Sequence, residues 1–280
     1  MSRLALAAAL ALAACAVYAE GWIGRIRTAA AQHEEIMRVE VRPGVVEPVL
    51  LSMQSAGQKP KRIVMLFPGG DGVMQIRQKP GGTWFKLLGN YLIRARAQFV
   101  DAEDIAVSVD MPSDEYCCAG DRFRLGERHA ADVGKIIDAL AARFPGAQVY
   151  LAGTSRGTIS AASLAARLGP QRIAGVVLTS SVTQDGPGGQ GLSRFDYAAL
   201  KVPVLLVHHK YDACHVTPYW AAEKISREHR FPLVTVTGSE GASGDACQAF
   251  SHHGYAGREK QVAAAIMGWV RTRAVAPTID

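Results

Sequence analysis

The sequence predicts an α/β fold in which a mostly parallel β-sheet is covered by helices on both faces. Short apolar runs, of the length of buried strands, alternate along the chain with longer segments whose apolar residues recur at the spacing of one helix face. Strands that are apolar throughout are typical of parallel sheets that are covered on both sides. The 280 residues are 49% hydrophobic and 20% charged, which is enough apolar mass for one sizeable core.

The expected elements begin with an antiparallel pair of strands, 38–41 and 46–53, joined through Pro43-Gly44. The Gly-rich connection 183–194 lies between two later strands and is too short for a cap domain, so we expect a flexible loop over the site and no large lid. The remaining strands are expected at 62–67, 104–109, 148–152, 173–178, 202–207 and 233–236, and the helices at 84–99, 128–144, 158–168, 219–229 and 259–274.

The start of the chain has the pattern of an export signal. Arg3 supplies a positive charge, and the wholly apolar run Leu4–Ala14 follows it. This run is too short to span a bilayer comfortably as a transmembrane helix. The pattern places the rest of the chain outside the cytoplasm, as a periplasmic or secreted protein.

Three fates of this signal stay open. Val17-Tyr18-Ala19 fits ordinary signal-peptidase cleavage, whereas Leu12-Ala13-Ala14-Cys15 resembles a bacterial lipobox, in which a lipid on Cys15 would attach the protein to a membrane. An uncleaved anchor is the third. We therefore divide the chain into a signal peptide or lipoprotein signal (1–19), a lead-in segment (20–37) and one α/β domain (38–280).

The charge of the chain argues against a nucleic-acid partner. The formal net charge is +6, but the Lys and Arg residues are scattered, with no long basic run and no interleaved aromatic residues. This distribution predicts a mildly basic surface. The oligomeric state has no signature in the sequence.

Ser155 lies in a Gly-x-Ser-x-Gly motif, Gly153-Thr154-Ser155-Arg156-Gly157. The motif alone is weak, because a serine between glycines is often only a turn. Here an apolar strand, 148–152, precedes it and an Ala-rich helix, 158–168, follows it, which is the strand–turn–helix context of a nucleophilic serine. The glycines let neighbouring backbone pass close by, and the helix N-terminus favours negative charge on a substrate oxygen. We predict that Ser155 is the nucleophile.

The acid that completes such a site should follow a later strand. Asp212 comes just after the apolar strand 202–207, at the end of the sheet where sites form. A turn or helix-capping role is the alternative for this residue. Asp245 and Glu240 are poorer candidates for the acid, because they are close to the expected histidine.

The base should follow the last strand, and Ser251-His252-His253-Gly254 lies in that loop. We favour His253, because the glycine after it permits a tight turn that could present the imidazole to Ser155. His252 stays open as the alternative, since adjacent side chains point in different directions.

The negative oxygen of the tetrahedral intermediate needs two backbone donors. One is the N–H of Arg156, the residue after the nucleophile. The turn after the early strand, Phe67-Pro68-Gly69-Gly70-Asp71-Gly72, should supply the other, and we assign Gly70, with Asp71 as the alternative. A phosphate-binding loop is disfavoured because no Gly-Lys-Ser/Thr follows.

Together these motifs resemble the α/β-hydrolase superfamily over nearly the whole mature chain. The resemblance implies an α/β-hydrolase fold and a serine hydrolase of the esterase type. More narrowly, five segments look like a group of secreted bacterial α/β-hydrolases without an established substrate, and this implies no particular activity. Many esterases have His-Gly-Gly where this chain has Pro68-Gly69-Gly70. The five segments are Phe67–Gly70, Gly153–Thr158, Val207–His209, Asp212–Cys214 and His253–Tyr255.

Four cysteines remain once Cys15 is assigned to the signal, an even number in an oxidising compartment. Cys214 follows Asp212 by two residues and Cys247 precedes His253 by six. If the acid and the base meet, their loops are neighbours, and we predict a Cys214–Cys247 disulfide that ties them together.

Cys117 and Cys118 are adjacent in a loop that follows a strand on the site side, so they could line the pocket. They could form a strained disulfide with each other, stay as thiols or bond elsewhere. The histidines and cysteines match no structural zinc spacing, so we predict no metal and no cofactor.

The leading hypothesis is hydrolysis of a carboxylic ester through an acyl-enzyme on Ser155, with thioesters or amides as further substrates. The substrate would be a small molecule or a larger ester-bearing one. A catalytically silent binding protein with the hydrolase fold is the alternative from another class. A metal-dependent hydrolase is less favoured.

Overall fold

A computed structural model describes residues 33–117 and 119–280 of the chain. The expected export signal (1–19, with Cys15), most of the expected lead-in segment and Cys118 lie outside these residues. Residues 33–37, which we had assigned to the lead-in, form the first half of strand β1 (His33–Arg42). Their partners are residues 49–53 of strand β2 (Val45–Met53), so the antiparallel pair is longer than the sequence indicated.

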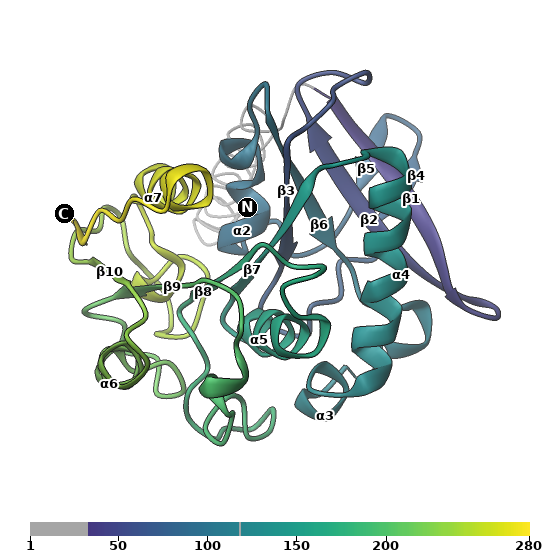
Figure 1. Ribbon diagram of the computed structural model, residues 1–280. Helices are drawn as coiled ribbons and strands as arrows, with labels where there is room; N and C mark the ends of the chain where they lie inside the picture. The colour runs from purple at the N-terminus through teal and green to yellow at the C-terminus, as the bar shows by residue number, and fades with distance from the viewer. Residues whose placement is uncertain (1–32, 118) are drawn as a thin grey trace, which may run out of the picture.

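The described residues form a nine-stranded sheet in the order β1-β2-β6-β3-β7-β8-β9-β10-β11. The pairs β1–β2 and β2–β6 are antiparallel, and every other pair in this sheet is parallel (Figure 1). This confirms the mostly parallel sheet with an antiparallel N-terminal pair. The remaining strands are β3 (Arg62–Phe67), β6 (Asp104–Val109), β7 (Gln148–Thr154), β8 (Gly175–Thr179), β9 (Val204–His209), β10 (Leu233–Val236) and β11 (Thr278–Ile279).

Helices cover both faces of the sheet, as expected. In Figure 1, α7 and α2 lie on one side of the sheet, and α5 and α6 lie on the other. The helical elements are α2 (Tyr91–Arg94), α3 (Asp121–Arg124), α4 (Glu127–Arg143), α5 (Gly157–Leu168), α6 (Tyr219–His229) and α7 (Glu259–Thr272), with 3-10 helices η1 (Arg96–Phe99), η2 (Ser113–Glu115), η3 (Tyr197–Ala199) and η4 (His252–Gly254).

The alternation of side chains along the strands divides the hydrophobic core in two. In β3, Ile63, Met65 and Phe67 join the core under α4 and α5, while Val64 and Leu66 join the core under α2 and α7. This division explains why the central strands are apolar at every position.

The expected continuous helix over 84–99 is wrong in its first half, and only α2 (91–94) and η1 (96–99) are helical in this segment. Trp84 ends β5 (Gly82–Trp84), which pairs with β4 (Arg77–Lys79) in a separate hairpin. Leu87 has a left-handed φ of 61°, which a continuous helix cannot contain. The helix starts only at Asn90, whose side chain accepts the N–H of Leu92.

The connection between β8 and β9 contains one helical element, η3, within the described residues. No cap domain is inserted there, which confirms the expectation from its length. In the same described part of the chain, no helix is both long enough and apolar enough to cross a membrane.

The parallel strands bring one set of loops together. β7, β8 and β9 are neighbours in the sheet, and their carboxyl ends are followed by Ser155, Ser180 and Lys210. Loops at this end of adjacent parallel strands form one edge of the sheet, which is where open α/β sheets place their sites.

Candidate active site

Ser155 lies in the turn between β7 and α5, in a strained backbone conformation. Its φ is 52°, in the left-handed region that side chains other than glycine rarely adopt. Its N–H donates to the carbonyl of Thr179 at the end of β8 (3.0 Å). A Cβ on Gly157 would lie 2.0 Å from the carbonyl oxygen of Phe67, and one on Gly153 would lie 2.4 Å from that of Gly157. The glycines of the motif are therefore required by close backbone approach, as the sequence predicted.

Asp212 and His253 form a buried pair. The Nδ1 of His253 lies 2.9 Å from Oδ2 of Asp212, whose side chain is fully buried. The same Asp212 oxygen accepts the Thr217 hydroxyl (2.8 Å), and the other oxygen accepts the N–H of Cys214 (2.9 Å). These bonds fix the carboxylate, so that it holds Nδ1–H of His253 and leaves Nε2 as the basic nitrogen.

Thr217 had no signal in the sequence. Its Oγ1 lies 3.1 Å from Nδ1 of His253 as well as against Asp212, so it contacts both members of the pair. Only the turn that follows β9 brings it back to Asp212, five residues earlier in the chain.

The end of β8 connects the Ser155 turn to the His253 turn. Thr179 accepts the N–H of Ser155, and the next residue, Ser180, donates its hydroxyl to the backbone carbonyl of His253 (2.8 Å). The hydroxyl of Tyr255 donates to the carbonyl of Val207 at the end of β9 (2.7 Å). The Ser155 turn and the turn that carries His253 are thus both attached to the end of β8, and the His253 turn is also attached to β9.

His252 points to other partners. Its ring stacks on that of His209, with centroids 4.4 Å apart, and its Nε2 lies 3.0 Å from the hydroxyl of Ser239. Of the two adjacent histidines, His253 is therefore the one that meets Asp212. Glu240, an alternative acid, is exposed and forms an ion pair with Arg258 at 3.8 Å.

The turn after β3 lies against Ser155. A Cβ on Gly69 would be 2.8 Å from the Cβ of Ser155, so Gly69 is the contacting residue of this turn. Among the described residues, no carbonyl or side chain accepts the N–H of Gly70 or that of Arg156. Both amides are therefore available to an external oxygen, and their role as oxyanion donors stays a prediction.

Cys214 and Cys247 are joined in a disulfide (S–S 2.03 Å), which confirms the predicted pairing. The bond connects the loop that carries Asp212 to the loop that leads to His253. Cys117 is also disulfide-bonded. In the described residues, one group of potential metal ligands gathers within 4.8 Å, namely Cys214, Cys247 and the exposed His215. The disulfide removes both sulfurs as thiolate ligands.

A second histidine, His208, lies buried beneath the site in β9. Its Nε2 accepts the N–H of Ser181 (2.9 Å). Burial lowers the pKa of His208 to about 4, so its ring is neutral at neutral pH. A neutral ring adds no positive charge near His253.

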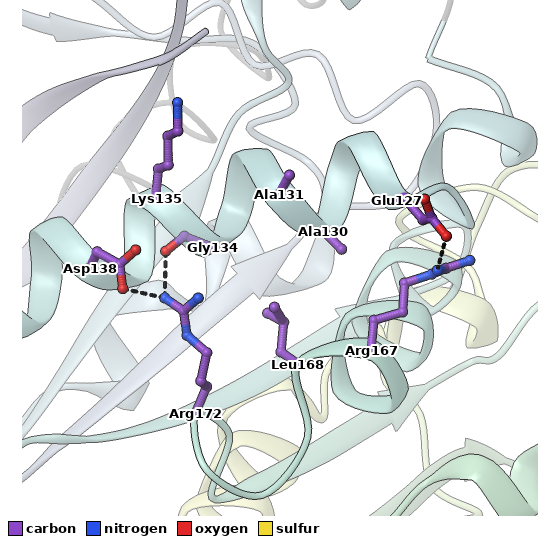
Figure 2. A pocket seen from close by; sticks show the side chains of 9 residues that line it. All are labelled: Glu127, Ala130, Ala131, Gly134, Lys135, Asp138, Arg167, Leu168 and Arg172. Carbon is purple, nitrogen blue, oxygen red and sulfur yellow. Dashed lines mark hydrogen bonds and ion pairs between the residues drawn. The ribbon is translucent and has the colours of Figure 1, made fainter.

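The surface of the described residues includes two hollows of interest. One, of about 250 Å³, adjoins the site and is lined by small side chains and His252. The other, of about 330 Å³, lies between α4 and the far end of α5 (Figure 2). Ion pairs of Arg172 with Asp138 and of Arg167 with Glu127 flank it, and no serine, cysteine or histidine is among the described residues that line it. The lining of the first hollow is Ala213, Ala242, Ser243, Gly244, Ala246, Ser251 and His252.

No protein-family model and no curated protein sequence matches the chain. Solved structures do share its fold. Est1E from Butyrivibrio proteoclasticus superposes with a TM-score of 0.57 at 14% identity, over 84% of this chain and 97% of that one. XC6422 from Xanthomonas campestris, a serine hydrolase without a lid, gives 0.54 at 14% identity, over 85% and 94% of the two chains.

A third similar structure is a cold-adapted esterase from an Arctic intertidal metagenomic library, with a TM-score of 0.54 and 16% identity over 78% of this chain and 89% of that one. At such identities the similarity concerns the fold. The chain therefore has the α/β-hydrolase fold, as its motifs predicted.

Proposed function

We propose that the chain is a serine hydrolase that cleaves a carboxylic ester through an acyl-enzyme on Ser155. The observation that carries the proposal is the buried His253–Asp212 pair, attached to the same strand end, that of β8, as the strained Ser155 turn. A silent binding protein would need neither the oriented imidazole nor the left-handed serine. The esterases and serine hydrolases with this fold add support.

The reaction follows from the roles of these groups. Nε2 of His253 takes the proton of Ser155 Oγ as this oxygen bonds to the acyl carbon. The carbonyl oxygen becomes negative and accepts the N–H groups of Gly70 and Arg156. The bond to the leaving alcohol then breaks, and the alcohol takes the proton from His253. Water then bonds to the acyl carbon while His253 takes its proton. The bond between the acyl carbon and Ser155 Oγ breaks, and His253 returns the proton to Ser155, which releases the acid.

The substrate class is a carboxylic ester, with thioesters or amides open to the same steps. A site without a lid admits a small molecule or a larger ester-bearing substrate. One solved structure with this fold is E-2-(acetamidomethylene)succinate hydrolase, at 14% identity and a TM-score of 0.53, so the fold accommodates different acyl substrates.

A fluorophosphonate probe tests this proposal, because it reacts with activated serines. We expect the wild type to be labelled and Ser155→Ala to be unlabelled, with ester hydrolysis lost in parallel. Ser193→Ala, at an exposed serine, is the control and should be labelled like the wild type. A folded wild type that takes no label supports the silent binder, and activity that a chelator removes supports a metal-dependent hydrolase.

We also propose that the chain is exported, in agreement with its disulfide, since such bonds persist in oxidising compartments. Membrane attachment would come from a lipid on Cys15. Mass spectrometry of the mature N-terminus separates the routes: a start at Glu20 indicates ordinary cleavage, and a lipid-modified Cys15 indicates a lipoprotein. A retained Met1 would exclude both cleavage routes.

A further inference from the structure

Arg124, at the end of α3, has a fully buried side chain that contacts the turn beside Ser155. Its Nη2 donates to the carbonyls of Asp71 (2.8 Å) and Gly70 (3.4 Å), and its Nη1 donates to the hydroxyl of Ser160 (3.0 Å). Ser160 lies in α5, one turn after Ser155. A single guanidinium therefore joins the two segments that would supply the oxyanion donors.

The turn is confined between this guanidinium and the nucleophile. A Cβ on Gly69 would lie 2.8 Å from the Cβ of Ser155, and a Cβ on Gly72 would lie 2.5 Å from Nη2 of Arg124. The left-handed φ of Gly72, 76°, wraps the chain around the guanidinium. No larger residue fits at either end of the turn, so its position depends on Arg124 on one side and Ser155 on the other.

The peptide planes of the turn are also fixed. The carbonyl of Gly69 accepts the N–H of Gly72 (3.2 Å), and the carbonyl of Gly70 accepts Nη1 of Arg156 (3.3 Å) as well as Arg124. Because C=O and N–H point in opposite directions across a trans peptide, the two bonds to the Gly70 carbonyl turn the N–H of Asp71 away from the guanidiniums. The bond from Gly72 to the Gly69 carbonyl fixes the peptide plane that carries the N–H of Gly70.

The guanidinium of Arg124 is held by neutral acceptors, and Asp71 and Asp121 attract its charge only from beyond ion-pair distance. Arg156 has an acidic partner, Asp121, at 2.7 Å, but within residues 33–117 and 119–280 no carboxylate lies within ion-pair distance of Arg124. Burial lowers the pKa of Arg124 to about 9, so it stays charged at neutral pH. A buried charge without a partner is costly, so stability alone does not explain its presence.

We propose that Arg124 is a positioning residue for the oxyanion: it fixes the turn that carries the N–H groups of Gly70 and Asp71 relative to the N–H of Arg156, and it places a buried positive charge on the side of this turn that faces away from Ser155. The inference rests on the proposed serine-hydrolase function. Donors and charges that are oriented before the reaction stabilise the transition state without reorganisation, and they act on the negative oxygen more than on the neutral substrate.

Steady-state ester hydrolysis tests the proposal. We expect Arg124→Met to lower kcat by about 10²-fold, the scale of one lost oxyanion donor, with KM changed by less than about threefold. Arg124→Lys keeps the charge but lacks the planar fork, and should fall between Arg124→Met and the wild type. The matched control is Arg172→Met, since Arg172 also donates to a backbone carbonyl, that of Gly134, at the far end of α5 (Figure 2).

Two readouts separate positioning from a purely structural role. A trifluoromethyl ketone, which binds serine as an anionic adduct, should lose affinity for Arg124→Met in proportion to kcat/KM. Guanidinium ion should restore part of the activity of Arg124→Ala and none of that of Ser155→Ala. A folded Arg124→Met with kcat within about twofold of the wild type, or a loss confined to KM, overturns the proposal.

If Arg124→Met does not fold, Ser160→Ala decides the question. It removes the anchor of Arg124 on α5 and one oxygen atom from the core. We expect kcat and the affinity for the ketone to fall together by about fivefold, since one hydrogen bond is worth about 1 kcal/mol. Unchanged values overturn the proposal. These results also separate an incorrect role of Arg124 from an incorrect proposed function. If the proposed function is incorrect, the wild type itself neither hydrolyses esters nor takes the fluorophosphonate label.

Discussion

At Ser155 the backbone is held in a left-handed conformation that costs an L-residue about 1–2 kcal/mol. The surrounding contacts impose this strain, since Gly153 and Gly157 admit backbone where other residues would clash. Asp212 is fixed by burial and hydrogen bonds instead of backbone strain: its carboxylate is fully buried, and Thr217 and Cys214 donate hydrogen bonds to it. Both arrangements lower the local stability and fix the position of a side chain, as expected at a site that carries out chemistry.

The two adjacent histidines give a sharp prediction. His253→Ala should lower kcat for ester hydrolysis by at least about 10³-fold, because the nucleophile loses its base. His252→Ala should keep most of the activity, since His252 contacts His209 and Ser239 and no carboxylate. The matched pair is compared in one kinetic assay. The reverse order of activities would move the base to His252.

At the scale of elements, the sequence predicted those strands, helices and turns whose pattern lies within a short stretch of the chain. Apolar strand runs and the Gly-x-Ser-x-Gly turn predicted β7 and α5 to within a few residues, and chain order led to Asp212 and His253. It failed over 84–99, where Leu87 and the cap at Asn90 interrupt the helical spacing. It also could not find Arg124, whose contact with Asp71 joins residues 53 positions apart and exists only in the folded chain.

The disulfide is the element-scale feature that can be removed most cleanly. Cys214 and Cys247 are 33 residues apart in the chain. Without their bond the unfolded chain has more conformational freedom, which should lower the free energy of unfolding by about 4 kcal/mol. The double variant Cys214→Ala/Cys247→Ala keeps the bond at Cys117. We expect a lower urea midpoint and a lower kcat, because the loops of acid and base are no longer joined.

The comparison for this variant is Cys117→Ala, which leaves the Cys214–Cys247 bond intact. If both variants lose stability but only the double variant loses kcat, the bond between the acid and base loops contributes to catalysis. Unchanged kcat and midpoint in the double variant would show that the sheet alone positions the pair.

At the scale of the whole molecule, the two cores bury titratable groups on and around the sheet. His129 of α4 packs between Phe67 and Phe123, and neither of its buried ring nitrogens has a hydrogen-bond partner among the described residues. Burial, and secondarily the nearby charge of Arg124, lower the pKa of His129 to about 3. Burial lowers the pKa of His208 to about 4. The folded protein therefore holds both rings neutral, at a cost that grows as the solution becomes acidic.

These two histidines should make the folded protein less stable as the pH decreases. Between pH 6.5 and the folded pKa values, the unfolded chain binds protons on these histidines and the folded one does not, so the free energy of unfolding falls as pH decreases. At pH 5 each ring should lower it by about 2 kcal/mol relative to neutral pH. Glu47, whose pKa burial raises, acts in the opposite direction, so a difference between variants is needed to isolate the histidines.

His129→Phe provides that difference, because a phenyl ring keeps the contacts with Phe67 and Phe123 and cannot titrate. Urea unfolding at pH 7 and pH 5 should show a drop in stability about 2 kcal/mol smaller for His129→Phe than for the wild type. The control is His215→Gln, a substitution at an exposed histidine outside the core, and it should leave the drop unchanged. Equal drops in His129→Phe and wild type would mean that water reaches His129 in the folded state, and that the core beneath α4 is less closed than its contacts indicate.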